Sequence, residues 1–546
     1  MSKQIIFGDD TRAKIFKGIE MVAKTVTVTM GPKGRNVILD KGYGAPLVTN
    51  DGVTIAREIE LEDKFENMGA ALVKEAANKT NEIAGDGTTT ATLLTYALAK
   101  EGLRNIRTGV NAVELKNGMR KASVVIAQEL EKNSKTISTK GEIAQVASIS
   151  AQDSEVGDII AEAMDRVGKN GVISVEDGQT FGLTVELTEG MQFEQGYISP
   201  YMLTNGEKMI SEMRDAPILI TDEKLSNMKD ILPLLEQLLG SGRKDLLIIA
   251  EDVDGEALTT IILNRMKGVL NVLAIKAPGF GDRKKEMLKD IAILTGATVI
   301  TKELGLKFEN ASMEHLGRAK SVTSTKDKTT IIGGEGEKSE IEARVREIAA
   351  QISNTKGEFD KEKLAERLAK LAGGVAVIKV GAASEVEMKE KKLRIEDALN
   401  ATRAAVEEGV VAGGGVALLK ASKALEGINF GNEDQNIGAQ IVARALSYPI
   451  KTIAENAGKE GSVIVSQVLS NSDINYGYDA ANDEFKNMLE AGIIDPKKVE
   501  RVALEQAVSL AGMFLTTEVA VTDIPKKEEA LPDMSAMGGM PGMGMY

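Results

Sequence analysis

Three glycine-rich loops lie far apart in this sequence, and their distribution limits how the chain can fold. They occupy residues 31–34, 85–87 and 413–415. Two of them lead into a predicted helix, where free backbone N–H groups and the positive end of the helix dipole can hold an anion. If all three loops serve one ligand, the two ends of the chain must fold together, and the residues between them form an insertion.

The middle loop has the residues best suited to bind a phosphate and a cation. Residues 85–92 read Gly-Asp-Gly-Thr-Thr-Thr-Ala-Thr and run into the apolar segment Leu93 to Leu103, where Gly102 suits a helix end. The threonines offer hydroxyl donors to a phosphate, and Asp86 suits a divalent cation beside it. The Walker A pattern GxxxxGK[ST] is absent from the chain. A Gly-Asp-Gly turn before an ordinary N-capped helix explains the same residues without any ligand.

Composition excludes several classes of protein. Apolar residues make up 43% of the 546 residues but aromatic residues only 3%, so the cores must be aliphatic. That length indicates roughly three or four domains. The net charge of −14 argues against nucleic acid or an anionic membrane as a partner. Cysteine is absent and His315 is the single histidine, so we expect no disulfide, no thiolate or histidine metal site and no histidine-based triad.

Periodicity predicts a multidomain α+β/α protein. The two ends are mainly helical, residues 134–190 form a small α+β region, and β and α segments alternate between 191 and about 374, which indicates an α/β domain with parallel strands. The predicted helices cover residues 10–29, 65–83, 154–167, 225–239, 255–267, 284–294, 340–372, 391–408 and much of 416–512. The predicted strands cover residues 37–39, 47–48, 172–175, 183–187, 218–220, 246–250, 272–275, 298–300, 375–380 and 514–521.

The sequence also predicts turns, a disordered end and the location of the protein. Residues 42–44 separate the strands of a hairpin, and residues 475–479 form a turn. The Gly/Met-rich end, Met534 to Tyr546, is of low complexity and expected to be disordered. The first residues lack a signal-peptide pattern, and no apolar run reaches the roughly 18 residues of a membrane span. We therefore expect a cytoplasmic protein.

Two predicted helices are more apolar than one buried stripe requires. Residues 231–239 read ILPLLEQLL and residues 258–263 read LTTIIL. The excess predicts either a helix packed on two sides or an exposed patch that binds a partner. The pattern alone favours the buried interpretation.

The chain resembles the group I chaperonins of bacteria, the GroEL family, over essentially its whole length. The Gly-Met repeat at the C-terminus is of the same type. The stretches that carry the resemblance are Val28 to Val37 (VTMGPKGRNV), Glu58 to Ala70 (EIELEDKFENMGA), Gly85 to Thr92, Lys276 to Arg283 (KAPGFGDR), Leu371 to Ala383 (LAGGVAVIKVGAA) and Ala401 to Leu418 (ATRAAVEEGVVAGGGVAL).

The resemblance implies three domains and a disordered tail. Both chain ends build an equatorial ATP-binding domain, a hinge domain is intermediate, and an apical domain that binds substrate and co-chaperonin is inserted in the middle. Their implied boundaries are 1–133 with 409–525, 134–189 with 375–408, and 190–374, followed by the tail 526–546. The hinges would lie near Gly190, Gly374 and Gly409.

The resemblance also implies the nucleotide site. Asp86 would bind Mg²⁺, residues 87–90 would surround the phosphates, Asp397 would position the attacking water, and Asp51 would assist near the γ-phosphate. Gly414 would lie near the ribose, and Asp495 would help to hold base and sugar. The full implied set for ATP is Thr29, Met30, Gly31, Pro32, Asn50, Asp86, Gly87, Thr88, Thr89, Thr90, Gly414, Asp479, Ala480, Ala481 and Asp495.

Three positions depart from the family pattern. Asn50 stands where many members have lysine, so a side-chain role there would change, whereas a role of its backbone carbonyl toward K⁺ would be kept. Asp479 stands where the family has asparagine, which puts the base and ribose contacts in question. Met30 replaces leucine and conserves volume.

Function follows from the same resemblance. Two back-to-back seven-membered rings would bind non-native proteins on exposed apolar helices, which reverses the buried interpretation above. ATP would release the client into an acidic cavity capped by a ring co-chaperonin of the GroES type, so that the client folds or refolds there. The implied client-binding residues are Tyr197, Ser199, Tyr201, Met202, Leu232, Leu235, Leu258, Ile262, Leu263 and Asn264.

Two other functions remain as alternatives. One is a chaperonin-like scaffold with weak ATPase activity, for which Asn50 and Asp479 are the sequence hints, although Asp51, Asp86 and Asp397 are all present. The other is an enzyme that hydrolyses nucleotide to act on a small substrate. It would leave the apolar helices unexplained.

Overall fold

The chain forms two compact units. In the computed structural model the described residues are 2–40, 46–151, 153–168, 171–178, 180–206, 209–355, 357–382 and 384–524. Unit 1 comprises Met1–Thr136 with Glu407–Tyr546, and unit 2 is Ile137–Val406, inserted between them. The predicted hairpin turn at 42–44 and the tail 526–546 lie outside the described residues. Among those residues, no helix is both long and apolar enough to cross a bilayer.

Unit 1 is mainly helical, with four antiparallel strand pairs: β1 with β20, β2 with β3, β16 with β19 and β17 with β18. Its helices are α1 (Gly8–Thr27), α2 (Gly52–Glu58), α3 (Lys64–Ala84), α4 (Thr88–Ile106), α5 (Ala112–Lys132), α14 (Val416–Ala421), α15 (Glu433–Ala445), α16 (Tyr448–Asn456), α17 (Gly461–Ser470) and α18 (Lys497–Leu515). Its strands are β1 (Lys3–Phe7), β2 (Val37–Leu39), β3 (Leu47–Thr49), β16 (Val410–Ala412), β17 (Tyr476–Asp479), β18 (Glu484–Asn487), β19 (Ile494–Pro496) and β20 (Val519–Asp523).

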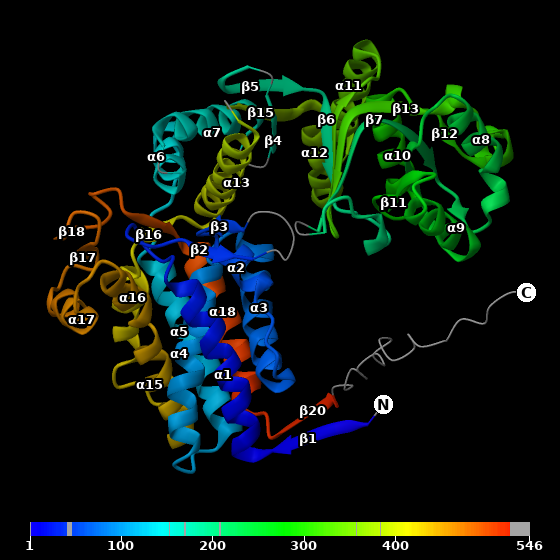
Figure 1. Cartoon of the computed structure of the whole chain (residues 1–546). Coiled ribbons are helices and arrows are strands. Elements are labelled where there is room, and N and C mark those ends of the chain that lie inside the picture. Colours follow the sequence, from blue (N-terminus) through cyan, green and yellow to red (C-terminus); the bar gives the residue numbers. More distant parts are fainter. Residues whose placement is uncertain are drawn as a thin grey trace, which may run out of the picture. The chain divides into compact units, whose positions relative to one another are not determined.

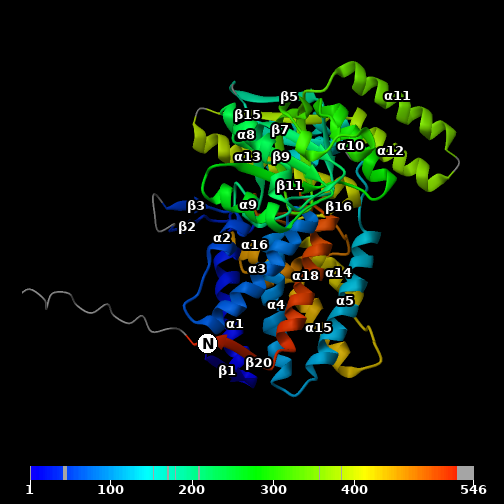
Figure 2. The ribbon, with the colours of Figure 1, turned by 90° about the vertical axis from the view of Figure 1, so that its right-hand side faces the viewer.

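The long helices of unit 1 lie side by side in a bundle, with α18 from the C-terminal end packed against α3, α4 and α5 (Figures 1 and 2). Their aliphatic stripes form one core. Facing glycines bring helices from the two chain ends into backbone contact. A Cβ on Gly118 of α5 would lie 2.1 Å from the carbonyl oxygen of Gln435, and one on Gly438 of α15 would lie 2.5 Å from that of Leu115. The two ends therefore fold as one body.

Unit 2 contains a seven-stranded sheet, a three-stranded sheet and helices on both. Its strands are β4 (Val172–Asp177), β5 (Gly182–Thr188), β6 (Gly190–Phe193), β7 (Ser211–Thr221), β8 (Lys224–Leu225), β9 (Asp245–Ala250), β10 (Asp252–Val253), β11 (Asn271–Lys276), β12 (Val299–Ile300), β13 (Gly317–Ser324), β14 (Thr329–Gly334) and β15 (Val375–Gly381). Its helices are α6 (Lys140–Ala151), α7 (Ser154–Val167), α8 (Leu232–Gly240), α9 (Gly255–Met266), α10 (Asp282–Thr295), α11 (Lys338–Asn354), α12 (Glu358–Ala372) and α13 (Glu385–Glu408).

The larger sheet has the order β11-β9-β7-β13-β14-β6, with β12 also paired to β7. Strands β11, β9, β7 and β12 pair parallel with one another, whereas β13 pairs antiparallel with β7 and β14, and β14 pairs antiparallel with β6. The alternation of apolar strands and helices therefore correctly predicted parallel pairing. In the smaller sheet, β15 pairs with β4 and β5. Short 3₁₀ segments are Pro200–Met202, Met228–Asp230, Lys302–Leu304, Phe308–Asn310, Met313–His315 and, in unit 1, Ser422–Leu425.

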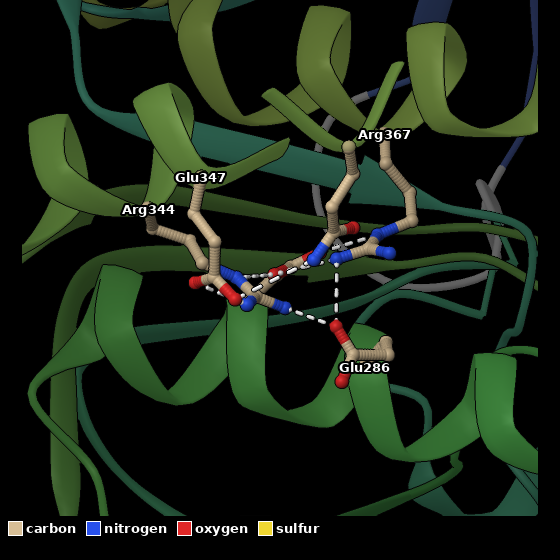
Figure 3. Close-up of polar contacts among 6 residues, drawn as sticks. Glu286, Arg344, Glu347 and Arg367 are labelled. Carbon is tan, nitrogen blue, oxygen red and sulfur yellow. Dashed lines mark hydrogen bonds and ion pairs between the residues drawn. The ribbon is translucent and has the colours of Figure 1, made fainter. Parts of the chain in front are cut away.

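A buried ion-pair network joins α10, α11 and α12 of unit 2. Figure 3 shows Arg344 and Arg367 converging with Glu286 and Glu347. Both arginines also donate to the fully buried Asp290, Arg344 from Nε at 2.7 Å and Arg367 from Nε at 2.8 Å. A buried carboxylate requires such partners, so the network fixes where α11 and α12 sit on α10.

Three predicted elements were wrong or incomplete. The helix after the middle glycine loop does not end near Gly102 but continues to Ile106. The absent side chain of Gly102 instead makes room for Leu515, whose Cδ1 would lie 2.4 Å from a Cβ there. Residues 476–479 are not a turn but strand β17, paired with β18. The late strand begins at Val519 rather than Phe514, because α18 extends to Leu515.

Three other differences concern unit 2. Helix α6 was missed because small residues, Ala147 and Ala151, form much of its buried face. The helix predicted for 225–239 begins only at Leu232, after the short strand β8 and a 3₁₀ turn. Segment 340–372 is two helices rather than one.

Candidate functional site

The loop between α3 and α4 leaves a helix N-terminus open. Gly85 and Gly87 both adopt left-handed backbone conformations, with φ of 75° and 86°. Gly87 is the N-cap of α4 and offers no side chain, so the first amides of the helix have no side-chain acceptor. By contrast, Asp51 and Asp63 cap α2 and α3. An uncapped N-terminus is suited to an external anion.

The first residues of α4 add hydroxyl groups to those amides. Thr88, Thr89 and Thr90 form no side-chain hydrogen bond with any described residue, whereas Thr95 on the next turn donates to the carbonyl of Ala91 at 2.7 Å. Thr89 and Thr90 are partly accessible to solvent. The hydroxyls of Thr89 and Thr90 are therefore available to a ligand, whereas Thr88 is buried and has no side-chain partner among the described residues.

The N-terminus of α2 lies against the same residues. A Cβ on Gly52 would come within 2.3 Å of Thr89 Oγ1 and 3.3 Å of Thr88 Oγ1. The preceding residue, Asp51, is exposed and caps α2 by accepting from the amides of Val53 and Thr54. This packing brings Asp51 to the start of α4.

Asp86 is the carboxylate most directly placed on the loop. It keeps access to solvent, yet the protein atoms packed around it raise its pKa, and the charge of Asp51 adds to the rise. The amide of Gly87, 2.5 Å from Oδ1, acts in the opposite direction. Because its pKa is raised, a cation beside this carboxylate would stabilise the ionised form.

The first glycine loop is held by the C-terminal part of the chain. Asn456, at the end of α16, donates from Nδ2 to the carbonyls of Thr27 and Met30, both at 2.9 Å. Gly31 has a φ of 83°, and a Cβ there would lie 2.9 Å from Ile453 Cγ2. Met30 packs on the small core that contains Ile453.

The third glycine loop belongs to the same assembly. The amide of Gly414 donates to Asp495 Oδ2 at 3.1 Å. Asp495 lies on β19, opposite Val411 of β16. A Cβ on Gly414 would lie 3.3 Å from Met488 Cε, and Met488 shares the small core with Ala480. The first and third glycine loops of unit 1 therefore pack on the same small core.

Asp479 is buried and fully engaged at the end of β17. It accepts from the amides of Ala481 and Asn482, from Asn482 Nδ2 at 2.8 Å, and from Lys486 Nζ at 2.7 Å. Burial alone would raise its pKa, but the hydrogen bonds from Lys486, Asn482 and the backbone lower the pKa to about 2. Ala481 is exposed beside it. The carboxylate orders this turn as well as offering acceptor oxygens.

The remaining predicted nucleotide residues are placed as follows. Thr29 is half-buried and donates to the carbonyl of Val26 at 2.8 Å, whereas Pro32 and Asn50 are exposed. Asp397 lies on α13 in unit 2 and is exposed there.

The donor set fits a magnesium nucleotide better than an isolated metal ion. No group of three or more histidine, cysteine or acidic residues among the described positions has the geometry to hold a metal. Mg²⁺ usually binds through one or two carboxylates together with substrate phosphates. Asp86 beside the uncapped α4 offers this arrangement.

The predicted client residues divide into exposed and buried groups. Tyr201, Leu232 and Leu263 are exposed, at 67%, 44% and 51%. Leu258, Ile262 and Asn264 are partly exposed. The side chains that form part of the unit 2 interior instead of its surface are Tyr197, Ser199, Met202 and Leu235.

Several residues of the apolar surface at α9 and beside the glycine loops were not predicted from the sequence. Met266, exposed at 70% at the end of α9, and Val269, in the segment after that helix, extend the apolar surface, and the apolar run at 258–263 just before them was the available signal. Asn456 and Glu500 gave no signal, because only the fold brings them to the glycine loops. Of the predicted hinges, Gly374 and Gly409 have positive φ, whereas Gly190 lies in β6.

Comparison with protein families places these features in a known context. The family model described as the TCP-1/cpn60 chaperonin family matches residues 22–525. The match includes the three glycine loops, both units and the apolar helices α8 and α9.

Proposed function

Because the chain belongs to the TCP-1/cpn60 chaperonin family, we propose that it is an ATP-dependent folding chaperonin of the bacterial group I type. The family consists of protein-folding chaperones that assemble into rings, bind client proteins and are generally ATPases. The finer features are our proposal: ATP hydrolysis by this chain, two seven-membered rings, a GroES-type cap and a cytoplasmic location.

One observation carries the ATPase proposal. The N-terminus of α4 is uncapped, two threonine hydroxyls are available on its first turn, and Asp51 and Asp86 flank it. Backbone amides, hydroxyls and a carboxylate for Mg²⁺ are the groups that stabilise charge during phosphoryl transfer.

Each residue has a proposed role. Residues 87–90 bind the phosphates, Asp86 holds Mg²⁺, and Asp397 orients the attacking water with help from Asp51. Mg²⁺, when bound, neutralises charge on the phosphoryl oxygens. The backbone carbonyl of Asn50 is a proposed ligand of K⁺. Residues 29–32, Gly414, Asp479 to Ala481 and Asp495 enclose the base and sugar.

The client surface is proposed on the exposed part of α8 and α9. Leu232, Leu263 and Met266 are large apolar side chains open to solvent, and apolar burial at about 25 cal/mol per Å² does not depend on sequence. Such a surface suits many non-native partners and the co-chaperonin. Several copies in a ring would add avidity.

The test combines particle mass, ATP binding, ATP turnover and refolding of an aggregation-prone client with a GroES-type cap. We expect a large ring whose refolding yield depends on ATP. Asp397→Ala should bind ATP with nearly unchanged affinity but hydrolyse it at least tenfold more slowly, whereas Asp86→Ala should lose Mg·ATP affinity. Asp158→Ala, an exposed acid on α7, is the matched control. Wild-type turnover by Asp397→Ala, or client refolding independent of ATP, would favour the scaffold with weak ATPase activity.

A further inference from the structure

Glu500 is a buried acid that the proposed mechanism does not use. It lies on the first turns of α18, is only 6% exposed, and its Oε2 has no hydrogen-bond partner among the described residues. Its side chain forms a hydrogen bond with that of Asp495. Two carboxyl groups can bond in this way only when one of them carries a proton.

Burial raises the pKa of both carboxyls, and the charge of Asp86 acts on both in the same direction. The hydrogen bond between them lowers the pKa of Asp495 and raises that of Glu500, which favours the proton on Glu500. The cations in the same turns of α18 are engaged elsewhere: Lys497 with Glu131 and Glu408, Lys498 with Glu407, and Arg501 with Glu408 and Glu505. The groups that act on Glu500 are thus the carboxylates of β19 and of the loop before α4.

The first turn of α18 also packs directly on that loop. A Cβ on Gly87 would lie 2.6 Å from Val499 Cγ1, and Val499 immediately precedes Glu500. Asp495 accepts from the Gly414 amide at 3.1 Å on its other side. Asp495 is therefore held between a backbone donor of the third glycine loop and a side-chain donor of α18.

We propose that Glu500 is a positioning residue of the nucleotide site, which in its neutral form donates a hydrogen bond to Asp495 and holds that carboxylate where it meets the sugar of the nucleotide. This inference rests on the proposed ATP site. When Glu500 ionises, the bond is lost, the two carboxylates repel each other, and a further negative charge lies close to an anionic ligand. Nucleotide affinity should therefore fall as pH rises.

The experiment measures the Kd of Mg·ATP from pH 6 to pH 9 for the assembled protein and three variants. Glu500→Gln keeps a donor but cannot ionise, and Glu500→Ala removes the donor. Glu505→Gln, on the same helix, is the matched control. We expect Glu500→Gln to match the wild type at pH 6 and to change less with pH. Glu500→Ala should bind about tenfold more weakly at pH 6, the loss of one hydrogen bond to a charged group.

The outcomes separate the two proposals. Titration of ATP and of Asp86 is common to all the proteins, so the difference between wild type and Glu500→Gln reports Glu500. A Glu500→Gln variant that retains the full pH dependence overturns the inference, and so does a Glu500→Ala variant that binds as tightly as wild type. If Glu500→Ala does not fold, the pH profile of Glu500→Gln decides alone. Failure of the wild type to bind Mg·ATP at any pH instead contradicts the proposed ATP site.

Discussion

The side-chain amide of Asn456 donates a hydrogen bond of 2.9 Å to the backbone carbonyl of Met30, 426 residues earlier in the chain. The same nitrogen also donates to Thr27 at 2.9 Å, beside the end of α1. One residue of the C-terminal half thus ties the first glycine loop to α16.

Replacing Asn456 by aspartate should loosen that loop. The carboxylate cannot donate, and it would face two carbonyl oxygens. We expect Mg·ATP affinity to fall about tenfold, with a loss of about 1–3 kcal/mol in the stability of unit 1. Isothermal titration and thermal denaturation measure the two effects. Asn117→Asp on α5, whose side chain has no hydrogen bond to a described residue, should change neither; unchanged affinity in Asn456→Asp would mean that the loop does not contribute to binding.

Gly52 tests the contact between α2 and α4. Gly52→Ala introduces a Cβ 2.3 Å from Thr89 Oγ1, so that hydroxyl must move. We expect ATP turnover to fall at least fivefold, because Thr89 would no longer be placed beside the phosphates. Gly141→Ala, at the start of α6 with no atom within 4 Å of the new Cβ, is the matched control. Normal turnover in Gly52→Ala would remove Thr89 from the proposed site.

The buried network in Figure 3 predicts that Arg344 contributes more to stability than Arg346, an exposed arginine of the same helix that lies outside the network. Arg344→Met leaves Arg367 as the one cation among the described residues that contacts both Asp290 and Glu286, and should cost unit 2 about 3 kcal/mol because the buried cluster then carries unbalanced negative charge. Arg346→Met removes an exposed pair with Glu342 at 4.0 Å and should cost less than about 1 kcal/mol. Hydrogen exchange of amides in α10, α11 and α12 compares them, and equal protection would show that the buried network is not required.

Asp479 predicts an acid-dependent loss of stability. Its pKa of about 2 in the folded protein lies below the ordinary value of 3.8, so its stabilisation is fully present above pH 4 and is lost as pH falls toward 2. The effect is on the order of 1–2 kcal/mol. Asp479→Asn retains acceptors for the amides of Ala481 and Asn482 but lacks this titration. Its loss of stability between pH 5 and pH 2.5 should be smaller than that of wild type; parallel curves would contradict the role of the Lys486 pair.

Local signals in the sequence predicted some helix starts but not the packing of the helices. The helix predicted for 154–167 is α7, which begins directly after its N-cap Asp153, whereas α2, which begins directly after its N-cap Asp51, was not predicted. Gly102 was predicted as a helix end because glycine is common where helices end. It lies inside α4 because Leu515 of α18 packs against it and leaves no room for a side chain. Strand β17 was taken for a turn because its partner β18 supplies the pairing.

The residues of the candidate site could also be predicted from the sequence only in part. The Gly85–Thr92 stretch could be identified from its own residues, since a glycine loop before a helix presents donors wherever it occurs. Glu500 could not, because an acid on the first turn of a helix is ordinary at a surface. Its burial beside Asp495 depends on α18 packing against the Gly87 loop. On α8, both Leu232 and Leu235 fit the apolar pattern, yet only Leu232 is exposed.

That difference between apolar residues predicts which substitutions reduce client capture. Leu263→Ser and Met266→Ser remove exposed side chains from α9 and should each weaken binding of a denatured client several-fold, since each loses about 1 kcal/mol of apolar burial per subunit. ATP turnover without client should be unchanged. Thr259→Ser, exposed on the same helix, is the control.

Leu235→Ser provides the opposite case. Its side chain is 2% exposed in the unit 2 core, so the substitution should lower the melting temperature by several degrees instead of acting on the surface. Client capture is measured by suppression of aggregation, and unit 2 stability by thermal denaturation. If Leu263→Ser and Met266→Ser lost stability but kept full capture, the client surface would have to lie away from α9. If they lost capture with an unchanged melting temperature, the exposed end of α9 would be part of the surface that holds non-native chains.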